Sequence, residues 1–77
     1  TPQEQAAALA NFGLLFSTKR VWKEGITWTE RALAIDRQTG DRQAEGADLA
    51  LLGTLYYQAG DTAKGSEAHM EALKIAE

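Results

Sequence analysis

The chain has 77 residues, so it can form at most one small domain, whose stability is marginal without additional help. It has no cysteine and one histidine, which excludes a disulfide framework and a Cys/His zinc cluster. The net charge of −3 is mild and interspersed, which argues against a nucleic-acid partner. No apolar run approaches the roughly 20 residues of a membrane span, and no signal peptide is recognisable. Additional stability must come from helix packing, self-association or neighbouring repeats.

The first residues have the pattern of a helix start. Thr1 can cap the helix, Pro2 suits its first position, and Glu4 stands three residues after the cap; the alternative is a frayed chain end. Between residues 5 and 17, apolar residues at three- and four-residue spacing predict one helical face, made of Ala8, Leu9, Phe12, Leu15 and Phe16. Residues 18–20 break this pattern and predict a tight turn.

The middle of the chain predicts two further helices, from about Val21 to Gln38 and from about Arg42 to Gln58. Gly40 supplies the left-handed residue that ends a helix, and Asp41 can cap the next one. The expected apolar stripes are Trp22, Ile26, Thr29, Leu33 and Ile35 on the second helix and Leu49, Leu52, Leu55 and Tyr56 on the third.

A fourth helix is predicted from about Thr62 to Ala76, with Gly60 ending the third helix and Asp61 opening the fourth. Its expected buried side consists of Ala68, Ala72, Leu73 and Ile75. Because no segment shows the alternation typical of a strand, the predicted fold class is all-α.

The two halves of the chain repeat one another at an offset of forty residues, without a gap. The matches include Ala7 with Ala47, Leu9 with Leu49, Gly13 with Gly53, Phe16 with Tyr56, Gly25 with Gly65 and Leu33 with Leu73. Self-similarity at this period indicates stacked helical hairpins. We therefore expect a single domain over residues 1–77, with one repeat at about 2–38, a linker at about 39–41 and a second repeat at about 42–77.

These residues resemble the tetratricopeptide repeat family. The second half carries the family pattern at Leu49, Leu52, Gly53, Tyr56, Gly60, Gly65, His69, Ala72 and Leu73, and the first half at Leu9, Phe12, Gly13, Phe16, Gly25, Ala32 and Leu33. The forty-residue spacing is similar to the longer-period subtype found in kinesin light chains and spindle-orientation adaptors. The resemblance implies two helix-turn-helix hairpins stacked as in a right-handed solenoid.

The chain departs from the family pattern at several places. Arg20 replaces the usual turn glycine, which predicts a strained or differently shaped turn in the first hairpin. Gly25 and Gly65 replace alanines, which should loosen both second helices. Thr29 replaces a packing aromatic, with Trp28 beside it as compensation.

Two repeats are fewer than the three or so that such arrays normally need for stability. Small residues such as Gly13 and Gly25 should let helices approach closely, while large ones such as Phe12 fill the space between them. A monomer should then expose an apolar end around Leu73 and Ile75. Either these ends pair between copies, or the chain, which begins at Thr1 rather than Met, belongs to a longer protein with more repeats.

No catalytic or cofactor-binding constellation is present, so we expect neither an enzyme nor a cofactor. The only histidine, His69, has no recognisable nucleophile partner and is interpreted as a packing or surface residue. Several acidic residues lie in or near the linker, but the loop pattern of a calcium site is absent. Asp41 is interpreted as a helix cap, and Asp36, Glu45 and Asp48 as solvated charge.

The glycines are dispersed and form no phosphate-binding loop. The basic residues Lys19, Arg20 and Lys23 are interpreted as part of a solvated turn rather than as a contact for an acidic partner.

The resemblance implies that the first helix of each hairpin lines a groove that holds a peptide or a partner helix. The candidate groove residues are Asn11, Leu14 and Thr18 in the first repeat and Leu51, Thr54, Tyr57 and Gln58 in the second. Small side chains line the same groove at Ala7, Ala10, Ala47 and Ala50. Asn11 matches the groove asparagine of the family, whose amide can donate and accept. Leu14 and Thr54 stand where chaperone-binding members clamp a carboxylate, which argues against acidic chaperone tails as ligands.

The predicted function is therefore a protein–protein interaction module, with a protein or peptide partner whose identity the sequence does not give. Its groove suits an apolar-anchored helix or an extended peptide. Two alternatives stay open: burial of the groove residues against neighbouring repeats, and a structural spacer or self-association unit without a groove ligand.

Overall fold

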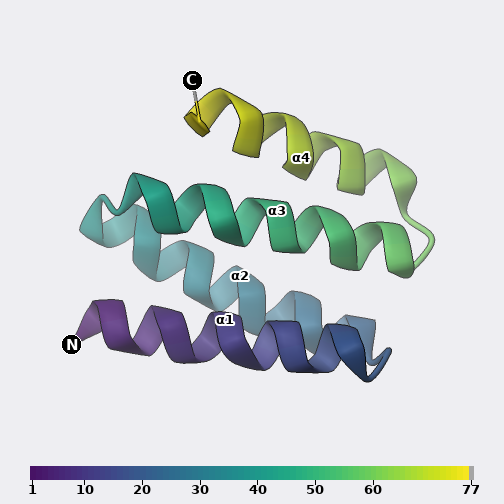
Figure 1. The fold of residues 1–77 in the computed structure, drawn as a ribbon, viewed down its shortest axis with the longest axis horizontal. Helices are drawn as coiled ribbons and strands as arrows, with labels where there is room; N and C mark the ends of the chain where they lie inside the picture. The colour runs from purple at the N-terminus through teal and green to yellow at the C-terminus, as the bar shows by residue number, and fades with distance from the viewer. Residues whose placement is uncertain (77) are drawn as a thin grey trace.

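The computed structural model describes residues 1–76 and is all-helical (Figure 1). The helices are α1 (Pro2–Thr18), α2 (Trp22–Thr39), α3 (Arg42–Gln58) and α4 (Thr62–Ala76), and no strand occurs among the described residues. The predicted all-α fold is confirmed. Helices α3 and α4 have the predicted bounds, and α2 lies one residue later in the chain than predicted. Glu77, the last residue of the predicted second repeat, lies outside the described residues.

The helix ends are fixed by the residues that the sequence singles out. The side-chain oxygens of Thr1, Asp41 and Asp61 each accept a hydrogen bond of 3.2 Å from the backbone N–H three residues later. Gly40 ends α2 in the left-handed conformation, with φ of 74°. Each cap satisfies backbone groups that the first or last turn of a helix leaves unpaired.

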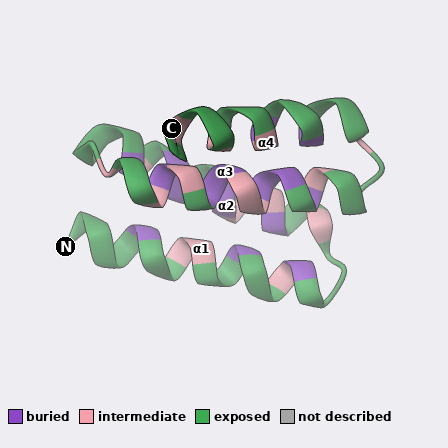
Figure 2. Cartoon of the chain, turned by 45° about the horizontal axis from the view of Figure 1, so that its top comes forward, coloured by how far each residue is buried: buried purple, intermediate pink, exposed green. Residues whose placement is uncertain are grey.

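Consecutive helices pack against one another, so that α1 with α2 and α3 with α4 form two hairpins joined through α2 and α3. In Figure 1, α1 and α3 run in the same direction on the near side, and α2 lies behind them. Buried residues concentrate on α2 and α3, whereas the outer helices α1 and α4 are mostly exposed (Figure 2). The shared core contains Leu33 from α2, Leu49 and Leu52 from α3, and Ala68 from α4.

Each hairpin crosses at a pair of glycines. A methyl group added at Gly25 would lie 3.3 Å from the carbonyl oxygen of Gly13, and one added at Gly65 would lie 3.0 Å from that of Gly53. The two helices of a hairpin therefore meet backbone to backbone, so closely that a Cβ atom at either position would require its neighbours to shift. This confirms the expected close approach at these glycines. The crossing also falls at corresponding residues in the two hairpins, which are forty positions apart.

Three large apolar residues differ from the predicted burial. Phe12, Leu15 and Leu73, all expected to pack inside, are 48%, 45% and 67% exposed. The prediction of burial is wrong for them because each side chain lies on an outer helix, on a side that no other described helix covers fully. Phe12 instead packs on Trp28, with ring centroids 5.4 Å apart, and the exposure of Leu73 matches the expected apolar end of the second hairpin.

The turn of the first hairpin places Arg20 in the left-handed region, with φ of 63°. Its counterpart forty residues later is Gly60, with φ of 92°. A residue with a Cβ atom is disfavoured in this region by about 1–2 kcal/mol. The turn therefore keeps the shape of the glycine turn and is strained, one of the two outcomes that the sequence predicts.

We expect Gly65→Ala to destabilise the protein by about 1–3 kcal/mol, because the added methyl would press on the backbone of Gly53. Gly46→Ala is the matched control. Its methyl would meet only the Ile75 side chain, at 3.3 Å, and its repeat counterpart is already Ala6. Alanine also gains about 1 kcal/mol of helix propensity over glycine. Urea unfolding should separate the two variants, and equal losses of stability would contradict the crossing as described.

We expect Arg20→Gly to stabilise the protein by about 1 kcal/mol, because glycine adopts a positive φ without strain, although it adds freedom to the unfolded chain. Arg20→Ala removes the charge and keeps the Cβ atom, so it should give no such gain. Thermal and urea unfolding of both variants check this. A gain shared by Arg20→Ala would assign the effect to charge rather than to conformation.

Candidate functional site

The predicted groove residues lie on α1 and α3, the two helices that run parallel on one side of the molecule (Figure 1). We call this set the α1–α3 stripe; it consists of Asn11, Leu14, Thr18, Leu51, Thr54, Tyr57 and Gln58. Leu51 is half-buried and the other six are exposed, with Leu14 at 54% and Tyr57 at 42%. The stripe is thus accessible, and it presents two large apolar side chains to solvent.

Three members of the α1–α3 stripe are held by hydrogen bonds within their own helix or hairpin. The hydroxyls of Thr18 and Thr54 donate to backbone carbonyls of their own helices, at 2.7 and 3.2 Å. The hydroxyl of Tyr57 lies 2.9 Å from Ser66 Oγ on α4, and its ring stacks on His69 with centroids 5.4 Å apart. Tyr57 is therefore fixed in place while one side of it remains exposed.

Gln58 links the two hairpins at the end of the stripe. Its Oε1 accepts a hydrogen bond of 2.8 Å from the hydroxyl of Ser17, which is buried on α1. Asn11, by contrast, makes no side-chain hydrogen bond within residues 1–76 and is exposed. Its amide is thus available to pair with the backbone of a ligand.

His69 lies where the sequence places it, against the neighbouring helix. A methyl group added at Gly53 would lie 2.6 Å from its ring, so the imidazole fills the space that this glycine leaves. The other ring face stacks on Tyr57. This is a packing position, as interpreted from the sequence.

The small wall residues of the predicted groove separate into two hollows. Ala7 and Ala10 line a hollow of about 150 Å³ between α1 and α3, together with Ala44 and the carboxyl groups of Asp36, Asp41 and Asp48. Ala47 and Ala50 instead line an apolar groove of about 690 Å³ between α3 and α4. The structure therefore does not bring the four alanines to one surface.

The acidic residues near the linker are not solvated charge, and that interpretation is wrong for three of them. Asp36 is 2% exposed, Asp48 5% and Glu45 9%. They are buried because α2 and α3 pack against each other at this point. Only Asp41 has the predicted role, as the cap of α3.

Asp36 on α2 and Asp48 on α3 are both buried where these helices pack, and their carboxyl groups lie close enough to influence each other. The pKa of Asp48 is raised to about 8, mainly by burial, with smaller contributions from the neighbouring Asp36 carboxyl group and from the charges of Asp36 and Asp41. The Oδ2 atoms of both residues are buried without a hydrogen-bond partner. With a pKa of about 8, Asp48 is mostly protonated at neutral pH, which avoids burying two carboxylate charges side by side.

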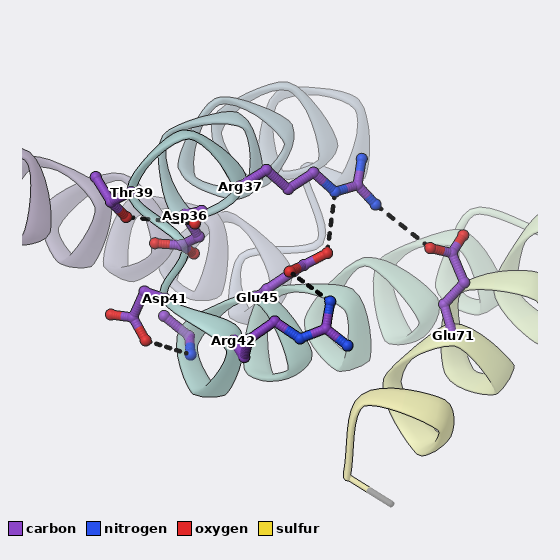
Figure 3. A network of polar contacts seen from close by, with 8 residues as sticks. Asp36, Arg37, Thr39, Asp41, Arg42, Glu45 and Glu71 are labelled. Carbon is purple, nitrogen blue, oxygen red and sulfur yellow. Dashed lines mark hydrogen bonds and ion pairs between the residues drawn. The ribbon is translucent and has the colours of Figure 1, made fainter.

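Glu45 is stabilised by arginines at the edge of the same interface (Figure 3). Arg37 Nε donates to Glu45 at 3.1 Å and its Nη2 donates to Glu71 on α4 at 3.3 Å, while Arg42 lies 3.8 Å from Glu45. Arg37 thus joins α2, α3 and α4. No group of three His, Asp or Glu side chains within residues 1–76 is arranged to hold a metal ion.

Comparison with protein-family models, with curated proteins and with solved structures found no match to this chain. Among the described residues, no helix is long and apolar enough to cross a membrane.

The carboxyl pair and the Ser17–Gln58 bond are the features that sequence reasoning missed. A signal for the pair was present: Asp36 follows Ala32 and Leu33 at helical spacing, and Asp48 precedes Leu52 by four residues. Both aspartates therefore lie on apolar stripes. Their place in the apolar pattern, taken without regard to their charge, predicts burial in the core.

We expect the free energy of unfolding to fall as the pH rises from about 4 to about 8 and to level off by pH 9. The folded pKa of Asp48, about 8, lies above its ordinary value of 3.8, so its contribution is complete below pH 3.8 and is lost progressively until the pH has passed through 8. Asp48→Asn keeps a neutral donor and should flatten this profile, with a gain of about 1–3 kcal/mol at pH 9.

Urea unfolding across this pH range measures the effect. Glu67→Gln is the control because this residue is exposed on α4, and its profile should follow the wild type. An Asp48→Asn profile that runs parallel to the wild type would show that Asp48 does not titrate in this window.

Proposed function

We propose that this chain is a protein-interaction module of the tetratricopeptide kind, which binds a peptide or partner helix along the α1–α3 stripe. The observation that carries the proposal is the combination, on two parallel helices, of exposed Leu14, half-exposed Tyr57 and the unpaired amide of Asn11. An apolar anchor beside an amide that can pair with ligand backbone suits helix or peptide recognition.

The fixed geometry of the stripe supports this function. Tyr57 is held by Ser66 and His69, and Gln58 is held by Ser17, so these side chains lose little freedom when a ligand arrives. Tyrosine is also among the residues that contribute most to protein–protein binding. The arrangement of two similar hairpins supports the family assignment, which otherwise rests on the repeat pattern.

The proposal is tested by selecting peptides from a displayed random library against the 77-residue chain. Selected peptides should shift NMR signals along α1 and α3, and Asn11→Ala and Tyr57→Ala should each weaken binding by about tenfold. Tyr57→Phe keeps the ring and should retain most of the affinity.

Lys23→Ala is the control, because this exposed residue lies on α2, away from the stripe. Helicity measured by circular dichroism should be unchanged in all variants. If no peptide is enriched, or if enriched peptides bind equally well to Asn11→Ala and Tyr57→Ala, the stripe is not a binding surface.

A further inference from the structure

The groove between α3 and α4 has a counterpart in the first hairpin, which α3 covers except for the small hollow lined by Ala7 and Ala10. We call it the end groove; its apolar lining includes Gly46, Ala47, Ala50, Ala72, Leu73 and Ile75. Forty residues earlier, the counterparts are Ala6, Ala7, Ala10, Ala32, Leu33 and Ile35. Leu33 is 7% exposed because α3 covers it, whereas Leu73 is 67% exposed. The end groove is thus the same surface without its covering helix.

The helix that fills the first hairpin also has a counterpart. In α3, the covering face consists of Leu49, Leu52 and Leu55, which are 3%, 4% and 0% exposed. The corresponding residues of α1 are Leu9, Phe12 and Leu15, which we call the α1 face. Phe12 is 48% and Leu15 45% exposed. The chain therefore carries an open groove on one hairpin and, on the other, the helix face that matches it.

We propose that the end groove binds the α1 face of a second copy of this chain, so that copies stack head to tail. The contact repeats the packing between the two hairpins inside one molecule. Within the chain, Leu55 lies over Gly25, and a methyl added there would be 2.9 Å from Leu55 Cδ2. In the stacked pair, Leu15 of the incoming copy takes the same position over Gly65, the counterpart of Gly25.

The polar residues of the internal interface favour this occupant. Inside the molecule, the α2–α3 contact buries the carboxyl groups of Asp36 and Asp48. Their counterparts at the junction between copies are Ala76 in the groove and Ala8 on the incoming α1. At these two positions stacking therefore buries methyl groups where the internal interface buries ionisable ones, and neither position has a carboxyl group to desolvate.

The symmetry of this contact determines the assembly. The two surfaces are different patches of the same molecule, so each added copy leaves one groove and one α1 face open. Association of this type grows without closing on itself. A symmetric dimer, in which two end grooves face each other, would instead stop at two copies.

Sedimentation of the 77-residue chain over a wide concentration range tests the proposal. We expect the average mass to rise with concentration and to pass the mass of a dimer. A chain that stays monomeric up to its solubility limit, or that stops at a dimer, overturns it.

Two substitutions, one at each surface, test the contact itself. Leu73→Glu places a charge in the end groove and Phe12→Lys places one on the α1 face, and each should weaken self-association at least about tenfold. Met70→Glu and Gln3→Lys are controls on the same helices, at exposed positions outside both surfaces, and should leave self-association unchanged. Helicity is checked by circular dichroism, and Leu73→Gln repeats the groove test should Leu73→Glu lose its fold.

Mixing the two variants gives the decisive result. Leu73→Glu keeps an intact α1 face and Phe12→Lys keeps an intact end groove, so an equimolar mixture should form a dimer of one copy of each that grows no further. A mixture that stays monomeric overturns the proposal. So does self-association of Phe12→Lys alone, which would assign the groove to symmetric pairing or to another helix.

Discussion

The close crossing of two helices at paired glycines is the constraint on which the rest of this structure depends. At Gly13 with Gly25, and again at Gly53 with Gly65, the backbones approach so closely that a single methyl group would press on a carbonyl oxygen. Such an approach permits weak Cα–H···O contacts, but its main effect is geometric. It fixes the angle and separation of each hairpin, and hence the surface that each hairpin offers to the next.

The residues beside these crossings differ between the repeats while the crossings do not. Gly13 faces the buried hydroxyl of Thr29, which donates to the Gly25 carbonyl at 2.8 Å, whereas Gly53 faces the larger ring of His69. The glycine supplies the space, and a small or a planar side chain fills it. The two repeats thus use side chains as different as Thr29 and His69 at corresponding positions without changing the crossing.

The sequence predicted what depends on neighbouring residues along the chain. Caps at Thr1, Asp41 and Asp61, the left-handed Gly40 and the positions of the helices all follow from local backbone chemistry and periodicity. The burial of individual side chains was predicted less well from the sequence, because it depends on whether another helix covers the face on which they lie. Phe12 and Leu73 have the periodicity of core residues but lack a covering helix, and Asp48 has the chemistry of a surface residue but lies under one. For the candidate site, the sequence identified exposed positions on α1 and α3, but not the contacts of Tyr57 and Gln58 that hold them.

The buried aspartates distinguish the internal interface from one that is held by apolar residues alone. Burying the carboxyl groups of Asp36 and Asp48 together opposes folding unless one of them is neutral, and the raised pKa of Asp48 shows that it meets this condition. The internal interface is therefore sensitive to pH in a way that a purely apolar contact would not be. Because the corresponding positions at the outer surfaces are Ala8 and Ala76, the proposed stacking contact has no titrating group at these positions.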